Sequence, residues 1–245
     1  MTYCAGVMID AGIVLASDSR TNAGVDNIST FRKMKVFERP GDRVIVIVNS
    51  GNLAVTQATL NHLEHGIRRA EGVPSIMNVR SMWEVAELIG SALREVRHRD
   101  GPFLMQNNVD ASANFIIGGQ IAGEEQRLFM VYTEGNFIEA TPETPYFQIG
   151  EVKYGKPIID RVITAGTNMD DAVKCVLVSF DSTMRSNLSV GLPVDLVCYQ
   201  KDSLHLSMVR RFDEQDPYMR TLRQKWGEGV RRAFAELPRL EWDGR

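Results

Sequence analysis

The sequence predicts an α+β fold in which two antiparallel β-sheets are enclosed by pairs of helices, as a four-layer αββα sandwich. Segments typical of strands and of helices alternate in blocks, in the order strands, two helices, strands, two helices, strands. Short turn sequences separate neighbouring strand segments, which indicates hairpins and therefore antiparallel sheets. The 245 residues contain no long linker and no internal repeat. We therefore expect one domain over residues 1–212, with a helical extension of the same domain over 213–245.

The first half of the chain supplies the clearest strand and helix patterns. Residues 3–9 and 13–18 are apolar runs separated by Asp10-Ala11-Gly12, which predicts a hairpin. Residues 43–49 are rich in β-branched side chains and predict a buried strand that ends at Ser50-Gly51. Apolar residues at helical spacing then predict one helix that begins near Leu53 and a second over about 81–97.

The second half repeats the alternation. Strands are expected over 112–119, 127–133, near 137–139, and over 193–200 and 204–210. Helices are expected over 155–164, 169–185 and 216–236, the last with a basic face that either contacts solvent or another subunit.

Composition excludes several classes of protein. The hydrophobic fraction of 44% and the charged fraction of 24% are typical of globular proteins, not of disordered, coiled-coil or collagen-like chains. A net charge of −3 gives no reason to expect a nucleic acid or an anionic membrane as partner. No apolar run approaches the length of a membrane span, and no signal peptide is predicted at the N-terminus. Three scattered cysteines suit a reducing cytoplasm.

Metal and cofactor motifs are missing from the sequence. His62-Leu63-Glu64-His65 lacks the spacing of a zinc helix and predicts a surface helix. His98 and His205 are isolated, and neither has a cysteine nearby. We therefore expect no metal ion and no organic cofactor. Cys4 also has no histidine near it in sequence and is expected to be a small core residue.

The N-terminus suggests a nucleophile. Thr2 becomes the first residue if Met1 is removed, and a small second residue permits that removal. A free α-amine has a reference pKa of about 7.7–8.0, so it can accept a proton near neutral pH. Thr2 would then combine a hydroxyl nucleophile and an amine base in one residue.

The residues that follow Thr2 resemble a known family. The second predicted strand ends in the string Asp18-Ser19-Arg20-Thr21-Asn22-Ala23-Gly24. A segment that contains two lysines follows at residues 31–37, and Ser50-Gly51 later joins a predicted strand to a predicted helix. This order resembles the β-type subunits of the proteasome superfamily, within the N-terminal-nucleophile hydrolases, over about residues 2–210. The Thr-Tyr-Cys start, the Asp26–Met34 segment and the long C-terminal helix are most similar to the bacterial Anbu branch.

The resemblance implies a threonine-type peptidase or amide hydrolase of the N-terminal-nucleophile fold. It also implies a homo-oligomer, as a ring or a stacked assembly with the sites on an inner surface, and it leaves open whether an unfoldase acts with it. Carried over by position, the resemblance implies that Thr2 is the nucleophile and that Gly51 donates its N–H to the oxyanion. It also implies that Lys33 is the catalytic lysine, with Lys35 as the alternative, and that Asp18 orients this lysine. Thr21 and Asn22 would bind the peptide backbone, and Asn49 and Leu53 would line the pocket for the side chain before the scissile bond.

The sequence departs from the family pattern around the threonine amine. Glu151 stands where a serine is usual, and Ser186 replaces an aspartate in Arg185-Ser186-Asn187-Leu188-Ser189, whereas Ser189 is retained and could still hold the amine. Glu151 is either a replacement carboxylate or a solvated residue in the first turn of a helix. We expect weak or selective activity. The alternatives are a catalytically silent scaffold subunit and a non-proteolytic amide hydrolase of a small or γ-linked substrate.

Overall fold

Antiparallel strands form the centre of the computed structural model, which describes residues 1–22, 28–67 and 74–240. The first sheet has the strand order β10-β1-β2-β11-β12, and the second has the order β5-β6-β7-β8-β9. The first contains β1 (Tyr3–Ile9), β2 (Gly12–Asp18), β10 (Tyr146–Gly150), β11 (Val194–Gln200) and β12 (Leu206–Phe212). The second contains β5 (Met34–Arg39), β6 (Arg43–Gly51), β7 (Ala113–Ile121), β8 (Arg127–Val131) and β9 (Phe137–Glu139). A separate ribbon pairs β3 (Arg20–Asn22) with β4 (Ile28–Thr30).

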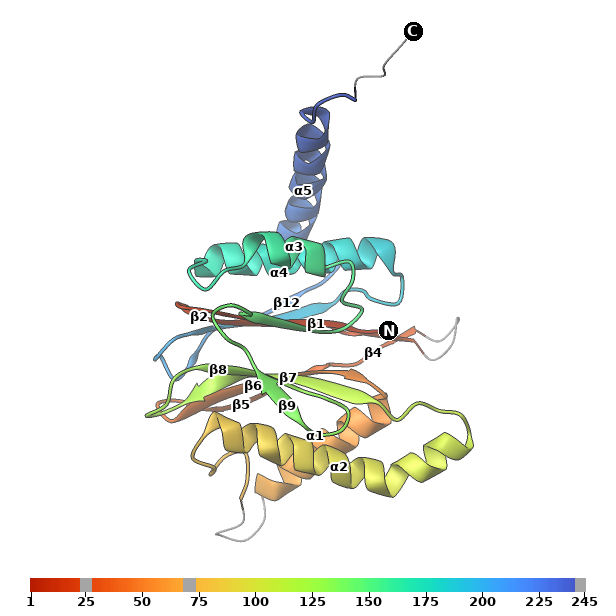
Figure 1. The fold of residues 1–245 in the computed structure, drawn as a ribbon, viewed down its shortest axis with the longest axis vertical. Coiled ribbons are helices and arrows are strands. Elements are labelled where there is room, and N and C mark those ends of the chain that lie inside the picture. Colours follow the sequence, from red (N-terminus) through yellow and green to blue (C-terminus); the bar gives the residue numbers. More distant parts are fainter. Residues whose placement is uncertain (23–27, 68–73, 241–245) are drawn as a thin grey trace.

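Helices cover the outer faces of both five-stranded sheets (Figure 1). In that view α1 (Leu53–Ile67) and α2 (Met82–Gln106) lie below the second sheet, and α3 (Lys156–Val162) and α4 (Met169–Ser186) lie above the first. The mixed α+β composition and the antiparallel pairing predicted from the sequence are confirmed. The division into residues 1–212 and 213–245 stays a prediction.

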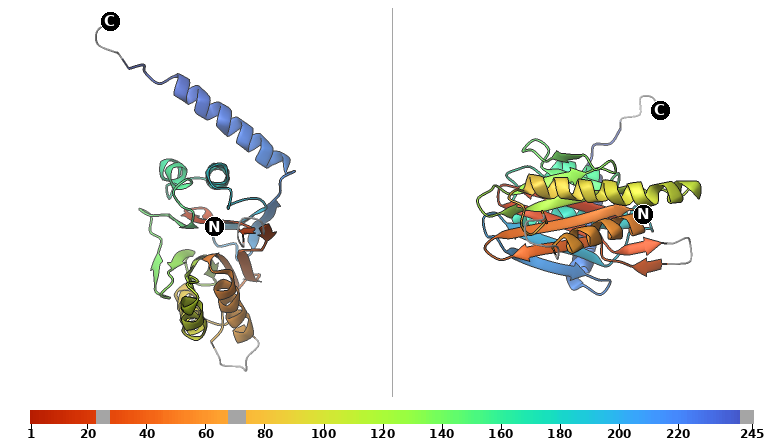
Figure 2. Two further views of the ribbon diagram at one scale, coloured as in Figure 1. Left: turned by 90° about the vertical axis from the view of Figure 1, so that its right-hand side faces the viewer. Right: turned by 90° about the horizontal axis from the view of Figure 1, so that it is seen from below.

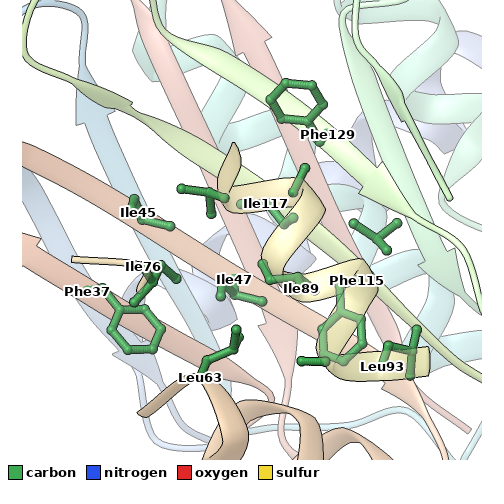
Figure 3. Packing of buried hydrophobic residues seen from close by; sticks show 14 of the residues in the cluster. Phe37, Ile45, Ile47, Leu63, Ile76, Ile89, Leu93, Phe115, Ile117 and Phe129 are labelled. Carbon is green, nitrogen blue, oxygen red and sulfur yellow. The ribbon is translucent and has the colours of Figure 1, made fainter. Parts of the chain in front are cut away.

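Three apolar cores hold these elements together. One lies between the second sheet and α1 and α2, where Ile47, Ile89 and Phe115 are fully buried (Figure 3). A second joins the first sheet to α3 and α4, and a third fills the space between the two sheets. Burial of such side chains contributes roughly 1.5–3 kcal/mol each, so these cores fix the positions of the strand ends that carry the site.

The first hairpin follows the predicted pattern closely. Ile9 pairs with Gly12 across the turn, and the pairing continues to Cys4 and Ser17. The alternation along β1 separates two faces, because Tyr3 and Ala5 pack in the core with α4, whereas Cys4 lies in the core between the sheets. Cys4 is fully buried, as expected of a small core residue.

Some elements differ from the predictions. The second helix was expected to end near Arg97, but α2 continues to Gln106 through Gly101 and Pro102. The strand expected over 127–133 ends at Val131. The sequence analysis did not predict β5, β10 or the β3–β4 ribbon.

The last helix, α5 (Pro217–Ala235), extends away from the layers (Figures 1 and 2). Its first turn is anchored, because Asp216 caps the N–H of Met219 and the Met219 side chain is buried. No helix in the described residues combines the length and the apolar character that a membrane crossing requires.

Candidate active site

Thr2 directly precedes β1, and the end of β10 holds it in place. The Glu151 N–H donates to the Thr2 carbonyl oxygen at 2.7 Å. Gly150 has a φ of +85°, and a Cβ there would lie 2.0 Å from the same carbonyl oxygen. Only glycine fits this position without displacing Thr2. The alternation along β1 places Thr2 on the same face as Cys4, toward the space between the sheets.

Asp18 and Lys33 form a buried ion pair next to Thr2. The Lys33 ammonium donates to Asp18 Oδ1 at 2.8 Å and to the Arg20 carbonyl oxygen at 2.6 Å. The two side chains are 0% (Asp18) and 5% (Lys33) exposed. Asp18 Oδ1 also accepts the backbone N–H of Tyr3 at 3.0 Å. One carboxylate oxygen therefore holds both the lysine and the residue that follows Thr2.

The surroundings of Asp18 shift the pKa of its carboxyl in two opposite directions. Burial raises the pKa of the Asp18 carboxyl, and the Lys33 ammonium is the largest of the interactions that lower this pKa again. The Gly191 N–H faces Asp18 Oδ2 at 3.4 Å and adds a donor from the loop before β11. An isolated charge in such a place is costly, so each member of the pair depends on the other.

Lys35, the alternative lysine, lies elsewhere. Its ammonium pairs with Glu64 on α1, and its side chain is 41% exposed. Lys33 lines the same small pocket as Thr2, and Lys35 does not.

The pocket beside Thr2 has a volume of about 160 Å³ and collects most of the predicted residues. It is lined by Met1, Thr2, Thr21, Lys33, Asn49, Ser50, Gly51, Leu53 and Thr56. These residues come from the segment before β1, from β3, from the approach to β5, from β6 and from the first turn of α1. The site therefore lies where strand ends of the two five-stranded sheets meet.

Gly51 forms the junction between β6 and α1. Its φ is +109°, and a Cβ would lie 2.2 Å from the Ser112 carbonyl oxygen, so the chain requires glycine here. Asn52 then caps α1, because its side-chain oxygen accepts the N–H groups of Ala54 and Val55 at 3.0 and 3.2 Å. The positive end of the α1 dipole consequently lies at the pocket.

The predicted substrate-binding residues occupy different parts of the site. Asn49 is buried and donates its side-chain amide to the Lys33 carbonyl oxygen at 2.9 Å, so it braces the lysine backbone. Leu53 lines the pocket. The Thr21 hydroxyl is buried and has no hydrogen-bond partner among the described residues. Asn22 ends β3, and its side chain lies outside the described part of the structure.

Glu151 is buried, although a solvated position in a helix was one of the two expectations for it. Its side chain is 6% exposed, and α3 begins only at Lys156. The Asn187 side-chain amide donates to Glu151 Oε2 at 2.8 Å, and Lys153 Nζ lies 3.4 Å from Oε1. The expectation of a solvated first-turn residue is therefore wrong.

The loop after α4 connects Glu151 to the rest of the site. Asn187 Oδ1 accepts the backbone N–H of Ser189 at 2.9 Å, and Ser189 is partly buried. Ser186, the residue in the place of an aspartate, ends α4 and is exposed. Asn187 was not singled out by the sequence analysis. Its only signal is its place within the Arg185–Ser189 string, since the contact with Glu151 joins residues 36 positions apart.

Comparison with solved structures gives close relatives over the whole chain. An Anbu (ancestral beta-subunit) protein from Yersinia bercovieri is 50% identical, with a TM-score of 0.92, over 99% of this chain and 100% of that one. The Anbu complex from Pseudomonas aeruginosa, described as a helical assembly, is 47% identical over 98% of both chains, with a TM-score of 0.92. A Gly-1 mutant of Anbu from Hyphomicrobium sp. strain MC1 is 44% identical, with a TM-score of 0.91, over 99% of this chain and 100% of that one. No protein-family model and no curated protein matches the sequence.

Proposed function

The chain belongs to the Anbu family of proteasome β-type subunits, and on this premise we propose that it is a threonine-type hydrolase of peptide or amide bonds. Its nucleophile would be the Thr2 hydroxyl after removal of Met1. Met1 is 64% exposed and so is accessible to an aminopeptidase. We also propose that the layers of helices and sheets correspond to the αββα sandwich of the N-terminal-nucleophile hydrolases.

One observation carries the proposal. A buried ammonium, Lys33, lines the same pocket as Thr2 and is fixed by a carboxylate that also binds the Tyr3 N–H. A fixed positive charge next to a hydroxyl favours its alkoxide-like form, which makes proton removal easier. A lysine with a purely structural role would not need to line the pocket that contains Thr2.

The proposed reaction proceeds through an ester. The neutral Thr2 α-amine accepts the hydroxyl proton while Thr2 Oγ bonds to the carbonyl carbon of the substrate. The Gly51 N–H, at the positive end of α1, donates to the oxygen that becomes negative. The C–N bond then breaks, the leaving amine takes the proton from the α-ammonium, and Thr2 carries an acyl ester. Water attacks this ester with the amine again as base and releases the carboxylic acid.

The substrate would lie along the pocket. The unpartnered Thr21 hydroxyl is available to a peptide backbone group, because a buried hydroxyl without a partner is costly. We propose that Asn22 acts beside it, and that Asn49 and Leu53 limit the side chain that precedes the scissile bond. A volume of about 160 Å³ favours a small or medium-sized side chain at this position.

Glu151 is proposed as the group that holds the free amine. It pairs with Thr2 through its own backbone, and its carboxylate is buried and oriented by Asn187. A carboxylate near an ammonium raises the pKa of that ammonium, so Glu151 would replace the charge that Ser186 lacks. Ser189, whose N–H bonds to Asn187, would complete this side of the site.

We propose that the protein acts as a homo-oligomer, as in the helical assembly of the Anbu complex from P. aeruginosa. The alternative function is a silent scaffold subunit. Ser186 favours it, because the family's aspartate is replaced at this position by a serine whose side chain is exposed.

Intact-mass measurement after treatment with a peptide epoxyketone tests the proposal. Processed wild-type protein and Thr2→Ser should each gain one adduct on residue 2, because both keep a hydroxyl and an amine. Thr2→Val keeps the shape of the side chain but lacks the hydroxyl, so it should gain none. Absence of an adduct on the processed wild-type protein would contradict the peptidase and favour the scaffold function. Profiling of α-linked against γ-linked peptide libraries then separates a peptidase from an amide hydrolase.

A further inference from the structure

The pocket beside Thr2 is polar on most of its sides. Met1 forms one wall, and the proposed processing removes it. Among the other described residues that line the pocket, Leu53 is then the only one with a fully apolar side chain. Ligand pockets are usually lined mainly by apolar and aromatic side chains, with a few polar groups that determine specificity. The polar groups of this pocket therefore indicate which kind of side chain fits it.

Thr56, in the first turn of α1, contributes a buried hydroxyl to the lining. The residue is only 2% exposed. Its hydroxyl donates to the Leu53 carbonyl oxygen at 3.0 Å, which uses its single proton. The lone pairs of Thr56 Oγ1 remain, and no described residue donates to them. This oxygen can therefore accept a hydrogen bond from a bound side chain.

Asn49, near the end of β6, contributes a second acceptor. Its side-chain nitrogen donates to the Lys33 carbonyl oxygen at 2.9 Å. Because that carbonyl can only accept, the nitrogen of the Asn49 amide must face it and the oxygen must point elsewhere. Asn49 Oδ1 accepts no hydrogen bond from the described residues. Thr56 and Asn49 thus both offer an acceptor to a ligand that brings a donor.

The charges around the pocket disfavour an ionised side chain. Lys33 is the only ionised side chain among the described residues of the lining, and Asp18 already pairs with it at 2.8 Å. A basic side chain would find no carboxylate in this lining and would lie next to the Lys33 ammonium. An acidic side chain would compete with Asp18 for the same ammonium. Burial of a charge without its own partner is costly, so a neutral side chain fits best.

We infer that the pocket selects substrates in which the residue before the scissile bond carries a short, uncharged hydrogen-bond donor, a hydroxyl or a primary amide. Thr56 and Asn49 would be the residues that determine this specificity. The inference rests on the proposed hydrolase and names its substrate class. A site built to form hydrogen bonds rejects an isostere that lacks the polar group, because the buried acceptors are then left without a partner.

Two pairs of isosteric reagents test this selectivity. Four peptide epoxyketones differ only in the residue next to the reactive group, which is asparagine or leucine in one pair and threonine or valine in the other. Intact-mass measurement gives the rate of adduct formation with processed wild-type protein. The asparagine and threonine reagents should each react about tenfold faster than their isosteres. An apolar pocket would reverse both orders, since leucine and valine gain more from burial. Equal or reversed rates would overturn the inference.

Thr56→Val tests whether the Thr56 hydroxyl causes the selectivity. The substitution keeps the shape of the side chain and should lower the asparagine-to-leucine rate ratio by about threefold or more, whereas Thr56→Ser should keep the wild-type ratio. Thr59→Val is the matched control. Thr59 is also a buried residue of α1 and donates to the Val55 carbonyl oxygen at 2.8 Å, but it does not line the pocket. Its substitution should leave the ratio unchanged.

The outcomes separate this inference from the proposed hydrolase. Absence of an adduct with all four reagents would overturn both. Adducts on Thr2 with no preference within either pair would overturn only the selectivity. An unchanged ratio in Thr56→Val would overturn the role assigned to Thr56.

Discussion

At the scale of single residues, the site depends on one buried charge pair. Asp18 has no exposed surface, and its Oδ1 accepts both the Lys33 ammonium and the Tyr3 N–H. The pair therefore links the lysine to the backbone of β1, the strand that directly follows Thr2. The ion pair serves to position these groups, because a buried ion pair contributes little net stability compared with apolar residues of the same shape.

Lys33→Met should destabilise the protein in a pH-dependent manner. Loss of the ammonium leaves Asp18 buried without its main partner, which costs about 3 kcal/mol of unfolding free energy near pH 8. Burial already raises the pKa of Asp18, and the substitution removes the interaction that lowers it most. A carboxyl whose folded pKa lies above its unfolded pKa takes up a proton on folding, so the loss should shrink as the pH falls toward 5. Denaturant unfolding at several pH values measures this.

Asp18→Asn/Lys33→Met provides the control for that prediction. It removes both charges and should recover most of the lost stability at pH 8 without restoring adduct formation at Thr2. A loss in Lys33→Met that stays constant between pH 5 and pH 8 would contradict the role assigned to the Asp18 charge.

Glu151→Gln should shift the pH dependence of the reaction at Thr2. The amide keeps the shape and an acceptor for Asn187 but removes the negative charge near the free amine. The pKa of the Thr2 ammonium should then fall by about one unit, so the neutral amine is available at lower pH. The acid limb of the rate of adduct formation against pH should move to lower pH by the same amount. Glu143→Gln, on an exposed turn, should leave the profile unchanged.

The three thiols should be unreactive in the folded protein. Burial raises the pKa of Cys198 to about 11 and that of Cys175 to about 12, and it raises the pKa of the fully buried Cys4 further. Because only the thiolate reacts, an aromatic disulfide reagent at pH 8 should titrate none of the three within minutes and all three in denaturant. Rapid reaction of Cys4 in the native protein, located by peptide mapping, would contradict its assignment as a core residue.

Residue types and their order made much of this site predictable. Thr2, Lys33 and Gly51 follow a local pattern, and the structure brings them to one pocket. The contact between Asn187 and Glu151 was not predictable, because it depends on how the loop after α4 meets the end of β10. No local periodicity or motif encodes a contact of that kind.

At the scale of elements, β10 has a function beyond its place in the sheet. It pairs with β1 from Tyr3 to Val7, and its last residue, Gly150, contacts the Thr2 carbonyl. Its apolar alternation extends over Phe147 to Ile149 only, which is too short to predict a strand. The extension of α2 through Pro102 was missed for a different reason, since proline normally ends a helix.

Gly150→Ala should damage the site more than the fold. The left-handed backbone at this position costs about 1–3 kcal/mol for a residue with a Cβ, and the new methyl group would also overlap the Thr2 carbonyl oxygen. Adduct formation at Thr2 should therefore fall at least tenfold. Gly41→Ala is the matched control, because Gly41 has a φ of +78° with open space around it. It should lose similar backbone stability and keep full reactivity at Thr2; equal reactivity of the two variants would contradict the clamp.

At the scale of the whole molecule, the pocket and α5 lie on different parts of the structure. The pocket is built where both sheets end, whereas α5 rises from the far side of the α3 and α4 layer (Figure 1). α5 contributes no residue to the lining of the pocket, and it carries the exposed apolar side chains of Trp226, Val230 and Phe234. The proposed homo-oligomer could cover such side chains, which a single chain leaves in water.

This arrangement predicts that thermal stability depends on protein concentration. Assembly binds only folded chains, so mass action should raise the unfolding free energy as concentration increases. Between 1 and 100 μM the gain should be about 1–2 kcal/mol per chain, which raises Tm by about 4 °C for a chain of this size. Val230→Glu places a charge among the exposed apolar side chains of α5 and should flatten this dependence if they lie in a contact between copies, while it leaves the Tm at 1 μM nearly unchanged, because Val230 is already 48% exposed in the single chain. A wild-type Tm that is constant across this range, measured by calorimetry, would show that folding is not coupled to assembly.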